Sequence, residues 1–361
     1  MAKTIVSDII ILCPRLRVVA LVDLDASRAT AALDAKLASP AAHAYADCKV
    51  FPTVAEAARS MLSQTPHIAI VGAPPFARGT DIPGRDLELQ LVEAFPRCAL
   101  FVEKPVSSGP EDACWRVADV LAKKGTLVGV GYMLRHGGTR PVPEDVRLTI
   151  TSADLTGVLT TATIKPSSSR PLTSVRKRPV PYVPQRLIPG LLGDLSRYFG
   201  GDVHLPSVVA HTVQPHEAPG KLSAKRFDED LIPPENRLPR LTSATWKYRG
   251  GAVGTLTHVI ALHGNTYDTE FEVYADGYRF KLVDPYGTPK LCIRRPGVAE
   301  EDVHVFKEDD PFRTELETFV DVVEERSSRD RVLSSYEDAI KTYELTWAIR
   351  RASEAAAASY A

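Results

Sequence analysis

Between residues 17 and 130, short apolar segments alternate with segments whose apolar residues recur at helical spacing. The short segments have the length of buried strands, and polar turns separate them from the helical segments. This alternation predicts a parallel sheet with crossover helices. The expected strands are residues 18–22, 67–71, 99–102 and 127–132, and the expected helices are residues 26–37, 87–95 and 110–124.

After residue 240 the apolar positions follow a period of two, which is typical of strands with one buried face. Two hairpins are expected, one at residues 242–260 and one at residues 270–283. The second contains Asp276 and Gly277 at its centre, a pair that favours a type I′ turn. The second half therefore predicts a mainly antiparallel sheet, followed by helices at residues 311–325 and 335–357.

Residues 136–192 fit neither pattern. They contain one aromatic residue, Tyr182, and no Asp or Glu occurs between residues 155 and 193, whereas basic residues and prolines accumulate. Such a segment buries little surface and repels itself, so we interpret it as a basic loop. The alternative is a nucleic-acid patch around Arg176, Lys177 and Arg178, which we consider the weaker interpretation.

Composition narrows the function classes. The formal net charge of -1 gives no general attraction for nucleic acid or for an anionic membrane. The five cysteines show no CxxC spacing, which favours reduced thiols in the cytoplasm. The apolar stretch at residues 9–13 is far shorter than the roughly 20 residues of a membrane span. We therefore expect a cytoplasmic protein with no membrane, nucleic-acid or metal site.

Four segments together resemble the Gfo/Idh/MocA oxidoreductases. They are Val-Glu-Lys-Pro at 102–105, Gly-Val-Gly-Tyr-Met-Leu-Arg at 129–135, the segment 194–201, and the hairpin strands within 243–258. The resemblance covers about residues 2–135 and 194 to the C-terminus. It implies an α/β Rossmann-like domain at residues 1–135 and an α+β domain with an open antiparallel sheet at residues 136–361. Pairing of such sheets in the family makes a homodimer compatible with the resemblance.

The resemblance also implies an activity. Family members use NAD or NADP to transfer a hydride to or from a hydroxyl-bearing carbon of a sugar-like or other small substrate. Lys104 would be the catalytic residue, moving a proton near the nicotinamide; the alternative is a surface lysine at a strand end. The matching cofactor-binding residues are Asp23, Arg28, Ala73, Pro74, Pro75, Glu103, Pro105 and Tyr132. The matching substrate-binding residues are Arg135, Asp194 and His258.

Several of these roles have alternatives. Asp23 follows the strand whose end binds the adenine ribose, where a carboxylate repels a 2′-phosphate, so NAD is slightly favoured over NADP. Arg28 could instead pair with that phosphate, and Asp23 could simply cap the following helix. Tyr132 and Arg135 could be exposed residues at a strand end. His258, like His263, could be a core histidine.

Two expected features of the family are missing from the sequence. Residues 2–12 read as the first helix of the domain, so the first strand and its GxGxxG turn are absent. In the strand order 3-2-1-4-5-6 this leaves a gap of about 9.5 Å, and the flanking strands must move together or stay exposed. Leu191 stands where the family usually has a histidine, three residues before Asp194.

These departures predict an impaired enzyme, or a catalytically inactive member that binds a ligand or a protein. We hypothesise that the sequence is an incomplete or altered reading of an intact gene. Reading the DNA before Met1 and across residues 136–192 tests this hypothesis, because the absence of a glycine turn and of a histidine codon in every frame would reject it. The sequence leaves open the substrate, the reaction direction and the oligomeric state.

Overall fold

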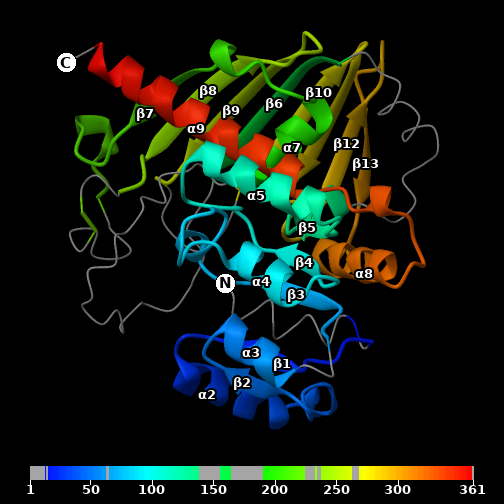
Figure 1. Cartoon of the computed structure of the whole chain (residues 1–361). Coiled ribbons are helices and arrows are strands. Elements are labelled where there is room, and N and C mark those ends of the chain that lie inside the picture. The colour runs from blue at the N-terminus through cyan, green and yellow to red at the C-terminus, as the bar shows by residue number, and fades with distance from the viewer. Residues whose placement is uncertain are drawn as a thin grey trace. The chain divides into compact units, whose positions relative to one another are not determined.

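The first half of the chain forms two separate parallel sheets in the computed structural model (Figure 1). The structure describes residues 13, 15–61, 65–137, 155–163, 190–223, 232–233, 237–261 and 268–359, with the backbone alone at 155–163 and 190–194. One sheet pairs β1 (Ala20–Val22) with β2 (Lys49–Phe51). The other has the order β3 (Ile68–Val71), β4 (Ala99–Val102) and β5 (Val128–Val130). The prediction of parallel strands is therefore confirmed.

The helices between these strands begin and end at residues suited to helix termini. Asp25 caps α2 by accepting a hydrogen bond from the backbone of Arg28. Pro110 precedes α5, and Gly125 follows it with a φ of +65°. The helices between the strands are α2 (Ala26–Leu37), α3 (Val54–Ser60), α4 (Leu87–Ala94) and α5 (Glu111–Lys123), with 3₁₀ turns at Ala42–Ala44 and Pro75–Ala77. Helix α8 (Pro311–Val323) and 3₁₀ turns at Met133–His136 and Arg329–Arg331 follow β5 in the chain.

The parallel strands in the described part of the chain do not form one continuous sheet. Among the described residues, no strand pairs with the outer edge of β3 or with the edge of β1 that faces away from β2. β4 is buried throughout, whereas Val22 at the end of β1 is 44% exposed. Leu21 of β1 and Ile68 of β3 nevertheless pack against the same apolar cluster. Side-chain burial therefore links the two sheets where a strand would otherwise supply backbone hydrogen bonds.

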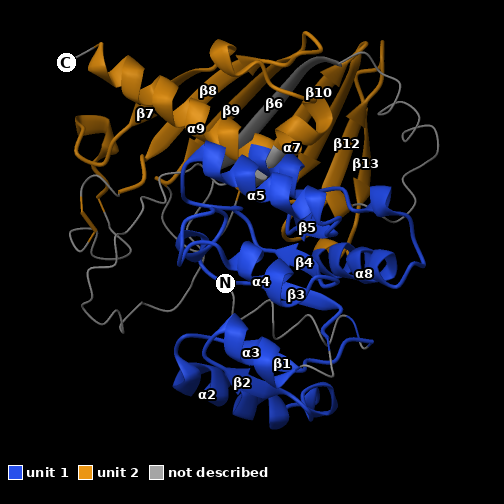
Figure 2. Ribbon diagram, viewed as in Figure 1, with its two compact units in different colours: residues 1–133, 312–340 blue, residues 134–311, 341–361 orange. Residues whose placement is uncertain are grey.

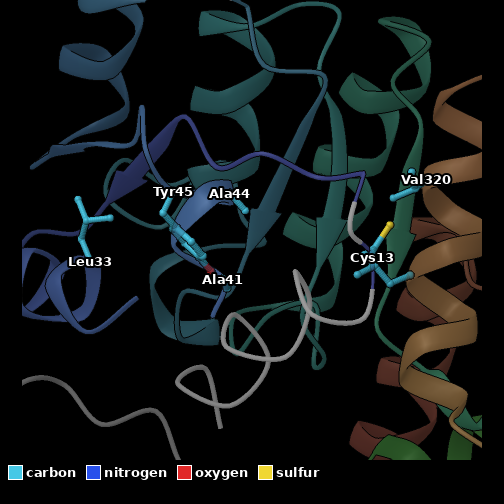
Figure 3. Packing of buried hydrophobic residues seen from close by; sticks show 7 residues of the cluster. Cys13, Leu33, Ala41, Ala44, Tyr45 and Val320 are labelled. Carbon is cyan, nitrogen blue, oxygen red and sulfur yellow. The ribbon is translucent and has the colours of Figure 1, made fainter. Parts of the chain in front are cut away.

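That cluster draws on both ends of the chain. Figure 3 shows Cys13 beside Val320 of α8, with Ala44 and Tyr45 grouped in another part of the cluster. The expected helix at residues 2–12 lies outside the described residues.

The second half forms one eight-stranded sheet, in the order β13-β12-β11-β10-β6-β9-β8-β7. Both predicted hairpins are confirmed, and Asp276 and Gly277 both have positive φ in the β10–β11 turn. The strands are β6 (Leu155–Thr163), β7 (Val209–Val213), β8 (Leu241–Lys247), β9 (Val253–Val259), β10 (Asp268–Ala275), β11 (Tyr278–Val283), β12 (Lys290–Arg294) and β13 (Glu301–Val305).

The interpretation of residues 136–192 as a loop is wrong for β6. This strand lies inside the sheet, antiparallel to β10 and parallel to β9. Its threonines and valine suit a strand, and pairing on both edges satisfies its backbone. Residues 138–154 and 164–189 of the expected basic loop, including Arg176, Lys177 and Arg178, lie outside the described residues.

Helices α7 (Gly190–Gly200) and α9 (Tyr336–Ala358) run across one face of this sheet (Figure 1). Alternate strand residues point to that face and are buried. Phe199 of α7 contacts Phe271 of β10, with ring centroids 5.1 Å apart. Two 3₁₀ turns, Leu205–Ser207 and Ala218–Gly220, complete the elements of this half.

The chain divides into two compact units that interleave along the sequence (Figure 2). Unit 1 comprises residues 1–133 and 312–340, and unit 2 comprises residues 134–311 and 341–361. The sequence predicts one boundary near residue 135, with α8 in the second domain. Instead α8 packs in unit 1, where Phe319 meets Phe101 of β4.

Candidate functional site

The carboxyl ends of β3, β4 and β5 bring three predicted segments to one edge of a sheet. Val71 pairs with Val102, and Val102 pairs with Val130. The segments that follow these residues contain the turn at 73–75, the Glu-Lys-Pro motif at 103–105, and Tyr132. Because ligands of open α/β sheets bind beyond the carboxyl ends of the strands, this edge is the candidate site of unit 1.

Lys104 is half-buried at this edge. Burial lowers the pKa of its ammonium group because the charged form loses solvation, while neighbouring Glu103 raises it. The Lys104–Pro105 peptide bond is cis. Its catalytic role and the alternative of a surface lysine at a strand end both stay predictions.

Glu103 is also half-buried. Its backbone N–H donates to Val71 O over 3.0 Å, which ties the motif to β3. Burial raises the pKa of its carboxyl group, and the charge of Lys104 opposes that shift. Burial thus favours the neutral form of each side chain, whereas their mutual attraction favours the charged pair.

The turn after β3 is held by Arg78, which the sequence analysis did not single out. Arg78 is 1% exposed, and its Nε donates to Ala73 O over 2.8 Å. The turn itself continues as a 3₁₀ segment at Pro75–Ala77. Arginine side chains usually lie in solvent, so no local signal in the sequence could have indicated the burial of Arg78.

Asp23 and Arg28 form an ion pair at the end of β1. Arg28 Nε donates to Asp23 Oδ2 over 3.0 Å, and its Nη2 donates to Oδ1. Asp23 Oδ1 also accepts the backbone N–H of Asp25 over 2.9 Å. Because Asp25 is the residue that caps α2, the interpretation of Asp23 as the helix cap is wrong.

Tyr132 is 1% exposed, so the alternative of an exposed residue at a strand end is wrong for it. Its backbone N–H donates to Val130 O over 2.7 Å. The preceding Gly131 donates to Val102 O over 2.9 Å, which continues the β4–β5 pairing. Contact between Tyr132 and a cofactor stays a prediction.

The three predicted substrate residues belong to unit 2. Arg135 is 7% exposed, and its guanidinium carbon lies 5.1 Å from the centroid of the Tyr198 ring. This cation–π contact holds the side chain against α7, so the exposed alternative is wrong for Arg135 too. Asp194 and Leu191 both lie in α7, and their side chains are outside the described residues.

His258 lies on the buried face of β9 and is 3% exposed. Its Nε2 has no hydrogen-bond partner among the described residues. Burial lowers the pKa of its imidazole to about 4, so the ring is neutral at neutral pH. It is a core histidine in position, and its contact with a substrate stays a prediction. His263 lies outside the described residues.

No helix in the described ranges of the chain is both long enough and apolar enough to cross a membrane. No three His, Cys, Asp or Glu side chains of the described part of the chain come together as ligands for a metal ion.

Comparison with known proteins identifies the family. Residues 2–132 match the model of an oxidoreductase family with an NAD-binding Rossmann fold, Gfo/Idh/MocA, and residues 181–278 match an oxidoreductase C-terminal domain. An uncharacterised protein of Schizosaccharomyces pombe is 37% identical over 350 residues, covering 95% of this chain and 84% of the relative. The chain belongs to the Gfo/Idh/MocA oxidoreductase family.

Solved structures share the Gfo/Idh/MocA fold at low identity. The WlbA dehydrogenase of Bordetella pertussis, in complex with NADH and UDP-GlcNAcA, is 12% identical with a TM-score of 0.60, covering 98% of this chain and 92% of that one. A super-repressor mutant of Gal80p from Saccharomyces cerevisiae is also 12% identical, with a TM-score of 0.65, covering 98% and 93%. At this identity the likeness concerns the fold.

Proposed function

We propose that this Gfo/Idh/MocA protein is an NAD(P)-dependent oxidoreductase that acts on a hydroxyl-bearing carbon of a sugar-like substrate, with Lys104 as the group that moves the proton. The observation that carries the proposal is the half-buried Lys104, in the Glu-Lys-Pro motif at the carboxyl edge of β4. The dehydrogenase WlbA, whose structure holds NADH and a UDP-sugar derivative, supports this class of substrate.

The lowered pKa of Lys104 suits proton transfer in both directions. A larger neutral fraction lets Nζ accept the proton of a substrate hydroxyl during oxidation. In reduction the ammonium donates that proton to the carbonyl oxygen. A bound nicotinamide would accept or supply the hydride. We infer slow turnover, because Leu191 provides no imidazole, a loss on the order of 10²–10⁴ in rate.

The residues present fit part of a dinucleotide. Asp23 can accept hydrogen bonds from the adenine ribose, and the turn at 73–75 and Glu103 lie at the sheet edge where the nicotinamide half would bind. Residues 1–71 contain no glycine. Within this range, the backbone N–H groups for the diphosphate would come from a turn without glycine.

NAD is the slightly favoured cofactor. The Asp23 carboxylate would repel a 2′-phosphate, and it also engages Arg28, the nearby cation that could bind one. Cytoplasmic location and a homodimer stay predictions.

Titration with NADH and with NADPH, followed by energy transfer from tryptophan to the nicotinamide, tests the cofactor site. We expect binding of at least one of them at submillimolar to millimolar concentration. Absence of binding of both at several millimolar would contradict the enzyme proposal and favour a ligand- or protein-binding member without catalysis.

A panel of nucleotide sugars and free sugars then tests turnover, monitored by the absorbance of the reduced cofactor. Lys104→Met should bind cofactor like the unaltered protein and lose on the order of 10²–10⁴ in turnover. Arg116→Met is the control, because Arg116 is a half-exposed arginine of α5 that pairs with the surface carboxylates Asp81 and Asp112. Equal turnover of Lys104→Met and the unaltered protein would contradict the role of Lys104.

A further inference from the structure

Arg78 and Glu88 place two opposite charges in the interior of unit 1. Their side chains are 1% and 0% exposed, and Arg78 Nη1 lies 3.8 Å from Glu88 Oε1. Charged groups are seldom buried this completely, because removing them from water is costly unless hydrogen bonds and a partner compensate. The hydrogen bonds that compensate this cost show which backbone groups the pair holds in place.

The guanidinium of Arg78 donates to three backbone carbonyl groups. Nε donates to Ala73 O over 2.8 Å, Nη1 donates to Val106 O over 3.0 Å, and Nη2 donates to Glu103 O. Glu103 immediately precedes Lys104, and Val106 follows it by two residues. One side chain thus binds the chain on both sides of Lys104 and joins it to the turn after β3.

Glu88 of α4 fixes the other side of this arrangement. Its Oε2 accepts the backbone N–H of Gly79 over 2.8 Å. Gly79 has a φ of +72°, and a Cβ there would lie 2.1 Å from Val106 O. The backbone after Arg78 therefore packs directly on the backbone after Pro105, an approach that only glycine allows.

We propose that Arg78, balanced by Glu88, is a positioning residue for Lys104: its guanidinium holds the carbonyl groups flanking Lys104 and so keeps the Lys104 side chain in its buried setting. The proposal deepens the proposed function and rests on it for the chemistry of Lys104. The effect of Arg78 on the surroundings of Lys104 does not depend on which substrate binds. Without these donors the carbonyl groups of Glu103 and Val106 must turn towards water, and Lys104 becomes hydrated with them.

The test measures the titration of Lys104 directly in the full chain. Trace labelling of amines with acetic anhydride across a range of pH, followed by peptide mass spectrometry, gives the midpoint for each lysine. The main variant is Arg78→Met/Glu88→Gln, which removes both buried charges together and leaves an amide oxygen at position 88 that can still accept from Gly79. Replacing a buried pair as a unit avoids leaving one charge unpaired.

In the unaltered protein, the labelling midpoint of Lys104 should lie below the ordinary lysine value of 10.5 because of burial. In Arg78→Met/Glu88→Gln it should shift upward towards that value, and in Arg78→Lys, which keeps the charge but offers fewer fixed donors, the shift should be smaller. The matched control is Arg116→Met/Asp81→Asn, an ion pair with both side chains at least 36% exposed, and it should leave the midpoint unchanged.

An unchanged Lys104 midpoint in a double variant with unaltered circular dichroism would overturn the proposal. Should the double variant not fold, Arg78→Lys decides the question by the same measurement. Titration with NADH separates this result from the proposed function. A shifted midpoint in a protein that binds neither NADH nor NADPH keeps the positioning role and rejects the enzyme, whereas cofactor binding with an unshifted midpoint does the reverse.

Discussion

Single charged residues determine most of the candidate chemistry of unit 1. Asp23 has two acceptor oxygens, and Arg28 uses both of them. The ion pair is partly exposed, with Arg28 63% accessible, so it contributes little to stability. The ion pair matters for cofactor preference, because it decides whether Arg28 pairs with Asp23 or with the 2′-phosphate of a bound cofactor.

Replacing Asp23 by Asn should therefore change cofactor preference. The amide no longer repels a 2′-phosphate, and Arg28 is released to pair with it. A charge-assisted hydrogen bond contributes about 1.5–3 kcal/mol, so the ratio of NADPH to NADH affinity should rise by about tenfold or more. Fluorescence titration with each cofactor measures this ratio. Asp34→Asn, an exposed position on α2, the helix that carries Arg28, should leave this ratio unchanged. An unchanged ratio in Asp23→Asn would count against the site.

His258 makes stability depend on pH. Its pKa is about 4 in the folded protein and 6.5 as an ordinary histidine. Because the unfolded chain binds the proton more readily, the contribution is present above pH 6.5 and is lost as pH falls from 6.5 towards 4. At roughly 1.4 kcal/mol per pKa unit, this shift amounts to about 3.5 kcal/mol of unfolding free energy.

His258→Gln should flatten the decline of unfolding free energy between pH 6.5 and 4, as measured by urea denaturation. His211→Gln provides the comparison, because His211 is exposed on β7 of the same sheet. Parallel pH curves for His258→Gln and the unaltered protein would show that the imidazole is not a buried neutral group.

At the residue scale, sequence predicted Lys104, Glu103 and Pro105 because the tripeptide is a local motif. It did not predict Arg78, although that side chain binds the same loop. The difference is physical: the contacts of Arg78 join residues 25 and 28 positions apart, and only the fold brings those carbonyl groups together.

Element boundaries followed local chemistry closely. Helix α5 begins after Pro110 and ends before Gly125, as the positions of Pro and Gly predicted. The sequence did not predict strand β6. The residues around it lack acidic and aromatic side chains, and this composition favoured a loop over the strand indicated by the threonines. Its place between β9 and β10 depends on pairing with residues about a hundred positions away.

The end of α7 requires a glycine at position 200, because a larger side chain has no space there. A Cβ at Gly200 would lie 2.2 Å from Cζ of Tyr248, whose hydroxyl donates to Ser196 O over 2.9 Å. Gly200→Ala should therefore destabilise the protein by about 1–3 kcal/mol, the usual cost of overpacking. Urea unfolding monitored by circular dichroism measures this.

Gly250→Ala is the matched control, because no atom lies within 4 Å of a Cβ at that turn position. At the helical position 200, alanine has a higher helix propensity than glycine by about 1 kcal/mol, which opposes the effect of the clash. A Gly200→Ala variant that is more stable than the unaltered protein would mean that helix propensity outweighs the contact with Tyr248.

At the scale of the whole molecule, unit 1 is completed by a helix from the far end of the chain. Phe319 of α8 is 2% exposed and meets Phe101 edge to face at 5.4 Å. A Cβ at Gly129 of β5 would lie 2.8 Å from the Phe319 ring. The helix therefore packs closely on the sheet that carries Lys104.

Phe319→Ala should lower the free energy of unfolding by about 3–5 kcal/mol, because it removes a buried ring and leaves a cavity. Phe312→Ala on the same helix should have little effect, since Phe312 is 48% exposed. Equal losses for the two variants in urea denaturation would contradict the assignment of α8 to unit 1.

The sequence by itself determined the features that depend on neighbouring residues. These are the strand–helix alternation of the first half, the two hairpins of the second, the helix ends, and the motifs that identify the family. It also predicted that, among the described residues, no strand joins β1 to β3. Such features follow from backbone preference and from the period of apolar side chains.

Only the tertiary structure decided which distant segments meet. It placed β6 inside the second sheet, α8 in unit 1, and the guanidinium of Arg78 against the carbonyl groups around Lys104. Each of these outcomes depends on burial and on hydrogen-bond partners far away along the chain. Their stabilisation arises once the surrounding elements have excluded water, and no local pattern encodes it.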